Sequence, residues 1–178
     1  LGIHWSRGLL KLTNVLKMFE PRLQHQIDVQ WAIDSEPWMP DESDLTHWAL
    51  HVLNGTDTVS GYSLKNRSVA AEICVRVVSE LEIQNLNRDY RQMNKVTNVL
   101  AFPQEVELED GTNLLGDIVI CAPVVAIEAK AQNKKPKAHF AHLVVHGVLH
   151  LLGYDHIEDL EAVEMESIEV RILKGLDI

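Results

Sequence analysis

Three histidines in the last third of the chain have the spacing of a single metal site. His146 and His150 are four residues apart, and on a helix this spacing places two side chains about 40° apart around the axis and about 6 Å apart along it. Gly153 follows, and a glycine there can adopt the left-handed conformation that ends a helix and turns the chain back. His156 would then reach the same ion as third ligand. Three protein ligands leave a fourth position for water, which is the arrangement of catalytic zinc sites.

Zinc is the metal that this ligand set predicts, because imidazole-rich sites with an open position suit it; nickel, copper and iron are the alternatives. His142 extends the row of histidines by one more helical turn. However, His142 and His150 would lie about 12 Å apart along a helix, too far to share an ion. We therefore expect one Zn²⁺ per chain, with His139 and His142 outside its ligand shell in packing or polar contacts. Each histidine taken singly is also compatible with an ordinary hydrogen-bonded structural residue.

The spacing H-x-x-x-H-x-x-G-x-x-H is also that of the metzincin proteases, which carry a glutamate directly after the first histidine as general base. Here that position is Gly147, which has no side chain to accept a proton. The string therefore predicts a metal-dependent hydrolase but argues against peptide hydrolysis by the metzincin route. Asp155 precedes the third histidine and is a candidate catalytic acid–base group, with orientation of a histidine ligand as its alternative role. Tyr154 is assigned to packing.

The composition is that of one soluble globular domain. Of the 178 residues, 46% are hydrophobic and 24% charged, and the net charge of −10 taken alone argues against a general nucleic-acid binder. The charge is uneven, because acidic residues concentrate between 155 and 169 whereas lysines cluster between 130 and 137. A local basic groove is therefore compatible with the total. No apolar run approaches the roughly 20 residues of a membrane helix, so we expect no membrane association.

The two cysteines, Cys74 and Cys121, both lie in apolar runs and do not form a C-x-x-C pair. Buried free thiols are the simplest interpretation. Because no disulfide framework is indicated, we expect a reducing, cytoplasmic location.

Hydrophobic periodicity predicts the elements that must position the histidines. Alternation or apolar runs predict strands over 27–33, 69–77, 97–103 and 114–121, with an acidic loop over 105–113 between the last two. Helical spacing predicts helices over 42–55, 79–90, 123–132, 137–152 and 158–174. Ser79 with Glu82 matches a capping box. In the last helix we expect an apolar face of Leu160, Val163, Ile168 and Ile172, and a solvated face of acids.

This order of elements predicts an α+β fold, with one mixed sheet of about four strands packed with about five helices in a single domain. The metal site would lie at the end of a helix in the C-terminal half. Residues 1–23 are predicted to be an N-terminal extension, helical or disordered. Residues 24–178 are predicted to form the metal-dependent hydrolase domain.

The full string HGVLHLLGYDH (146–156) resembles the YbeY family of bacterial endoribonucleases, whose pattern is close to H-G-x-L-H-L-x-G-Y-D-H. LNRDYRQMNKVTNVLAFP (86–103) resembles the family's N-x-x-Y-R-x-x-x-x-P-T-D-V-L-S-F-P, and LGDIVIC (115–121) resembles its L-G-D-I-x-I strand. The resemblance spans about residues 27–174. The departures are Val96 for proline, Asn98 for aspartate and Ala101 for serine. They change loop stiffness and polarity but remove no metal ligand.

The resemblance implies a single-strand-specific, metal-dependent endoribonuclease that acts in ribosomal RNA maturation, notably at the 3′ end of small-subunit RNA, and in ribosome quality control. It implies single-stranded RNA, ribosomal RNA and ribosome or small-subunit proteins as partners. It carries the three metal ligands onto His146, His150 and His156, and the family's functional arginine onto Arg91.

Phosphodiester chemistry is consistent with this transfer, because a guanidinium can hold two phosphoryl oxygens through parallel hydrogen bonds. We expect folding to bring the helix of Arg91 and the histidine helix to the two sides of one groove. The alternatives are another zinc hydrolase, acting on peptides or small molecules, and a ribosome assembly factor with a structural metal.

Overall fold

The computed structural model describes residues 24–55, 70–156 and 158–178. The prediction of an N-terminal extension over 1–23 therefore lies outside the described residues. The described elements are β1 (Gln26–Trp31), α2 (Glu42–Gly55), β2 (Ala71–Val78), α3 (Glu80–Arg91), β3 (Val99–Glu107), β4 (Asn113–Cys121), α4 (Ala122–Ala131), α5 (Pro136–Leu151) and α6 (Asp159–Gly175). Together they form one four-stranded sheet with five helices, which confirms the predicted α+β class.

The sheet is mixed, with the strand order β1-β2-β4-β3. Strands β1, β2 and β4 are parallel, and β3 lies antiparallel to β4 at one edge. The acidic loop predicted over 105–113 is shorter in the structure and spans residues 108–112, because β3 continues to Glu107 opposite Asn113. The register shifts after Pro103, as expected for a residue without an amide hydrogen. Opposite this shift Gly116 has φ 125°, and a Cβ there would lie 2.0 Å from the carbonyl oxygen of Phe102.

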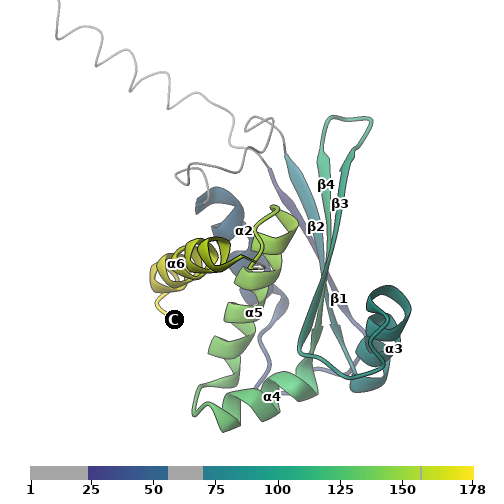
Figure 1. Cartoon of the computed structure of the whole chain (residues 1–178), viewed down its shortest axis with the longest axis vertical. Coiled ribbons are helices and arrows are strands. Elements are labelled where there is room, and N and C mark those ends of the chain that lie inside the picture. Colours follow the sequence, from purple (N-terminus) through teal and green to yellow (C-terminus); the bar gives the residue numbers. More distant parts are fainter. Residues whose placement is uncertain (1–23, 56–69, 157) are drawn as a thin grey trace, which may run out of the picture.

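One face of the sheet is packed against α2 and α5, and the other is covered in part by α3 (Figure 1). Ile118 and Ile120 of β4 belong to the larger core, which is completed by residues of α2, α5 and α6. Val119 and Cys121, which alternate with them, belong to a smaller core that includes Ile83 of α3. A strand that is apolar on both faces requires cover on both. Helices α3 and α5 therefore lie on opposite sides of the sheet.

Helix α5 is buried on almost all sides, and its histidines form its partly exposed stripe. His142, His146 and His150 are half-buried, whereas their neighbours on this helix between His139 and Leu151 are buried. The helix approaches the sheet closely at Gly147, where a Cβ would lie 2.7 Å from Cγ2 of Ile118. Close packing on β4 thus fixes the orientation of the histidine stripe.

Two local predictions need correction. In α6 the buried apolar residues are Met165, Ile168 and Ile172, whereas Val163 is 65% exposed; the side chain of Leu160 lies outside the described part. The capping box at α3 is only half formed, because Ser79 accepts from the amide of Glu82 but the Glu82 carboxylate bonds Arg76 instead. Among the described helices, none has the length and apolar character needed to cross a membrane.

Candidate metal centre and active site

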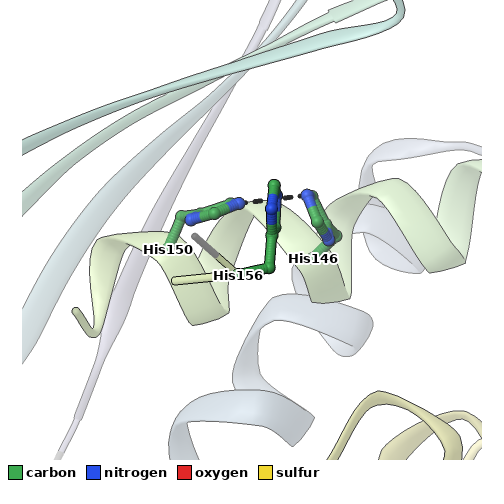
Figure 2. A group of neighbouring side chains, drawn as sticks. All are labelled: His146, His150 and His156. Atoms are coloured by element: carbon green, nitrogen blue, oxygen red, sulfur yellow. Dashed lines mark hydrogen bonds between the residues drawn. The ribbon is translucent and has the colours of Figure 1, made fainter. Parts of the chain in front are cut away.

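The three predicted ligands converge at the end of α5. Each of His146, His150 and His156 offers one ring nitrogen, and these atoms lie within 4.8 Å of one another (Figure 2). The Nε2 atoms of His146 and His150 are 3.1 Å apart, close to the separation of about 3.4 Å expected for two ligands of tetrahedral zinc with Zn–N near 2.1 Å. Gly153 has φ 89° and turns the chain so that His156 returns to the site, as its position in the sequence predicted.

Hydrogen bonds fix the tautomers of two of these rings. His150 Nδ1–H donates to the carbonyl oxygen of Tyr154 at 3.0 Å, because a carbonyl can only accept. His146 Nδ1–H donates to Glu169 Oε1 at 2.6 Å. In a neutral imidazole whose Nδ1 carries the proton, Nε2 presents a lone pair. Both Nε2 lone pairs therefore face the same point.

The pKa values of His150 and Glu169 are shifted by their surroundings. Burial lowers the pKa of His150, and the neighbouring His146 and His156 lower it further. Burial alone would raise the pKa of Glu169, but hydrogen bonds from His142 and His146 outweigh it and lower the pKa to about 2. At neutral pH His150 is thus an uncharged ligand, and Glu169 is an ionised acceptor beside His146.

This arrangement fits a metal ion. Two lone pairs 3.1 Å apart repel each other unless a cation or a proton lies between them, and the lowered pKa of His150 disfavours the proton. Among the described residues, these three histidines are the one set of at least three histidine, cysteine or carboxylate side chains whose ligand atoms lie close enough together to hold a metal ion. A set of three imidazoles suits zinc and other first-row transition metals. His156 is exposed, so the site is open to solvent and substrate.

The other two histidines of α5 point to carboxylates instead. His139 is buried, and its Nε2 lies 2.7 Å from Glu128 Oε2. Glu128 also accepts from Asn98, one of the positions that departs from the family pattern. His142 Nε2 lies 3.4 Å from Glu169 Oε2. Both histidines therefore make polar contacts outside the convergent set.

Asp155 stabilises the loop that carries the third ligand. Its Oδ1 accepts a hydrogen bond from the backbone amide of His156 at 2.8 Å. Its charge also acts on His150, whose pKa it raises against the larger effect of burial. These contacts favour an orienting role, and direct proton transfer by Asp155 stays a prediction.

Arg91 lies at the end of α3, on the other side of the sheet from α5 (Figure 1). The two helices therefore do not face each other across one groove, because β4 is apolar on both faces and each helix packs on a different one. That Arg91 and the histidines act on the same RNA strand stays a prediction. Arg91 instead reaches the sheet edge, where its Nη2 donates to the carbonyl oxygen of Ala101 in β3 at 2.9 Å. Arg91 is exposed as a residue, and its guanidinium has further N–H donors for a ligand.

The sequence matches the family model described as Endoribonuclease YbeY over residues 32–177. The chain belongs to this family. It is 47% identical over 154 residues to the Endoribonuclease YbeY of Alcanivorax borkumensis, an alignment that covers 84% of this chain and 82% of that protein. Membership of the YbeY family confirms the resemblance found in the sequence and the enzyme class of a nuclease.

The fold of this YbeY family member is also found in a solved structure. The solution structure of a protein from Thermotoga maritima superposes with a TM-score of 0.55 and 24% sequence identity, covering 84% of this chain and 87% of that one. At this identity the similarity concerns the fold, and it supports the α+β architecture.

Glu169 is the residue of this site that the sequence analysis missed, since it was assigned to the solvated acids of the last helix. It is only 8% exposed. The sequence does hold a pattern that indicates its burial. Glu169 follows Ile168 and lies four residues after Met165 and three before Ile172, all of which are buried. A carboxylate on a buried helical stripe requires a cationic or hydrogen-bonding partner, and the histidine string offers one.

Proposed function

We propose that this protein is a zinc-dependent endoribonuclease that cleaves single-stranded RNA. The observation that carries the proposal is the convergence of three imidazole nitrogens within 4.8 Å in a member of the YbeY family. Ribosomal RNA, notably the 3′ end of small-subunit RNA, is the proposed substrate. Ribosome or small-subunit proteins are the proposed partners, and ribosome quality control the proposed context. The free thiols of Cys74 and Cys121 are consistent with a cytoplasmic location.

The residues would divide the work as follows. His146, His150 and His156 hold the metal, which when bound polarises a phosphoryl oxygen, lowers the pKa of a water, or does both. Arg91, anchored on the Ala101 carbonyl, uses its free N–H groups to hold phosphate oxygens of an RNA strand that passes the β3 edge. Asp155 keeps the His156 loop in place.

The structure gives a physical reason against a metzincin-type peptidase. The residue after the first histidine is the general base in those enzymes, but Gly147 packs against Ile118 with no room for a side chain. A glutamate there would require the Ile118 side chain or α5 to shift. RNA cleavage is therefore favoured over peptide cleavage on this scaffold.

The test is to incubate the metal-loaded and the chelated protein with single-stranded RNA, duplex RNA and casein. We expect the metal-loaded protein alone to cleave, and only the single-stranded RNA. Cleavage of casein, or equal cleavage of RNA after confirmed removal of the metal, would reject the proposal. Re-addition of Zn²⁺, compared with Ni²⁺ and Mn²⁺, identifies the ion that restores activity.

A further inference from the structure

Glu169 of α6 is a buried carboxylate that contacts His146 on the ring nitrogen opposite the metal-binding one. Glu169 Oε1 lies 2.6 Å from His146 Nδ1, and its Oε2 lies 3.4 Å from His142 Nε2. Its side chain is 10% exposed, whereas that of His142 is 36% exposed. Both carboxylate oxygens thus contact histidines of α5. The contact with His146 uses Nδ1, which leaves its Nε2 facing His150.

We propose that Glu169 is the positioning residue of the metal centre: it holds His146 in the Nδ1–H tautomer, and His142 in turn holds Glu169. This inference rests on the proposed metal site and deepens it. A carboxylate that accepts from the distal nitrogen of a ligand fixes the ring orientation and raises the basicity of the ligating nitrogen. Glu169 would add to the three-histidine set an acceptor at His146 Nδ1, which orients the ring and favours the tautomer whose Nε2 is free to bind a metal.

The contacts of Glu169 with His142 and His146 also explain why His142 continues the four-residue spacing of His146 and His150 on α5. His142 lies one turn before His146, with ring centroids 6.3 Å apart, and it belongs to the same stripe without belonging to the ligand set. Its role is to occupy the second carboxylate oxygen, so that Glu169 presents the first one to His146. Helix α6 is therefore part of the metal centre, although it contributes no ligand.

The test compares Glu169→Ala and Glu169→Gln with Glu166→Gln, a matched control at an exposed position of the same helix. Zinc affinity is measured by chelator competition, and ligand geometry by the visible absorption of the Co²⁺-loaded protein. Loss of a partner of this kind typically weakens metal binding by about 10–100-fold. We expect that loss in Glu169→Ala, a smaller loss in Glu169→Gln, which retains an acceptor oxygen, and wild-type affinity in Glu166→Gln.

Metal-free wild-type protein gives a readout that needs no variant. Nitrogen NMR of the imidazoles should show His146 with its proton on Nδ1; a proton on Nε2 would overturn the proposal even if Glu169→Ala did not fold. Unchanged zinc affinity and an unchanged Co²⁺ spectrum in folded Glu169→Ala would overturn it as well. A wild-type protein that binds zinc normally but cleaves no RNA would reject the proposed function and leave this inference standing.

Discussion

The Nε2 atoms of His146 and His150 lie 3.1 Å apart, while the opposite nitrogen of each ring donates a hydrogen bond to an oxygen. The hydrogen bonds to Glu169 and to the Tyr154 carbonyl therefore favour the tautomers in which Nε2 is the metal-binding atom. The protonation states and positions of the ligands can be tested separately from catalysis.

Metal content should depend most strongly on the three convergent histidines. We expect the purified protein to hold about one equivalent of a transition metal, since three imidazoles form one site. His150→Ala should lose most of it, whereas His142→Ala should retain most. Elemental analysis of both variants checks this, and equal metal content in the two would show that the ligand assignment is incorrect.

Metal removal should lower thermal stability reversibly, because the ion binds the native state preferentially. At a free zinc concentration 100 times the Kd, binding contributes about 2.7 kcal/mol. For a chain of this size that corresponds to a Tm change of about 5–10 °C. Differential scanning calorimetry before chelation, after chelation and after re-addition of zinc measures it. A melting curve that is unchanged after verified removal would contradict a stabilising site.

Acid should destabilise the metal-free protein partly through Glu169. Its pKa in the folded protein is lowered to about 2 from an ordinary value of 4.5, so between these values the unfolded chain binds a proton that the folded chain does not. The contribution of ionised Glu169 to the free energy of unfolding is therefore complete above the pKa of the unfolded chain, and it is lost as the pH falls towards about 2. Urea unfolding at pH 5, 4 and 3 (roughly the window of this titration) should show a shallower loss in Glu169→Gln than in wild type.

The control for this pH series is Glu164→Gln, which removes an exposed carboxylate from the same helix. It should retain the wild-type slope. If Glu169→Gln and wild type lost stability in parallel, the ionised carboxylate would not be the source of the acid sensitivity.

Arg91→Ala and Arg91→Lys should both lose most RNA cleavage. Lysine keeps the charge but not the planar set of donors, and groups that stabilise transition-state charge are typically worth about 10²–10³ in rate. Metal content and far-UV circular dichroism should stay near wild type. Arg76→Ala is the control, since Arg76 of β2 bonds Glu82 of α3 and Gln30 of β1. Near-normal cleavage by folded, metal-loaded Arg91→Ala would remove Arg91 from the mechanism.

Gly147→Ala should destabilise the protein, because its Cβ would lie 2.7 Å from Cγ2 of Ile118. Overpacking of this kind costs about 1–3 kcal/mol. The penalty should be smaller in an Ile118→Ala background, which removes the opposing atoms. A double-mutant cycle by urea unfolding measures this coupling. Additive changes in the free energy of unfolding would show that the alanine side chain at position 147 and Ile118 do not clash.

The histidine site was predictable because it is local. Helical spacing and the left-handed Gly153 place His146, His150 and His156 together within one helix and the turn that follows. The partner of His146 was not predictable from spacing alone, because Glu169 comes from α6 and reaches the site only through the packing of two helices. The acidic surroundings of Glu169 made it resemble a solvated residue.

The position of Arg91 also depends on how elements pack, which residue spacing does not predict. Its helix was predicted nearly to the residue, since α3 ends at Arg91. Which face of the sheet the helix would cover depends on how β4 divides its apolar residues, with Ile118 and Ile120 on one side and Val119 and Cys121 on the other. Periodicity identifies such a strand as buried on both faces but does not assign a helix to either.

The hydrogen bond from Arg91 to the Ala101 carbonyl also bears on self-association. β3 is an edge strand, and exposed edges offer backbone groups to which a second chain can add. The register shift after Pro103 interrupts this edge, and Arg91 occupies the Ala101 oxygen. Besides its proposed contact with RNA, Arg91 thus covers one of the backbone groups through which a second copy of the chain could pair with this edge.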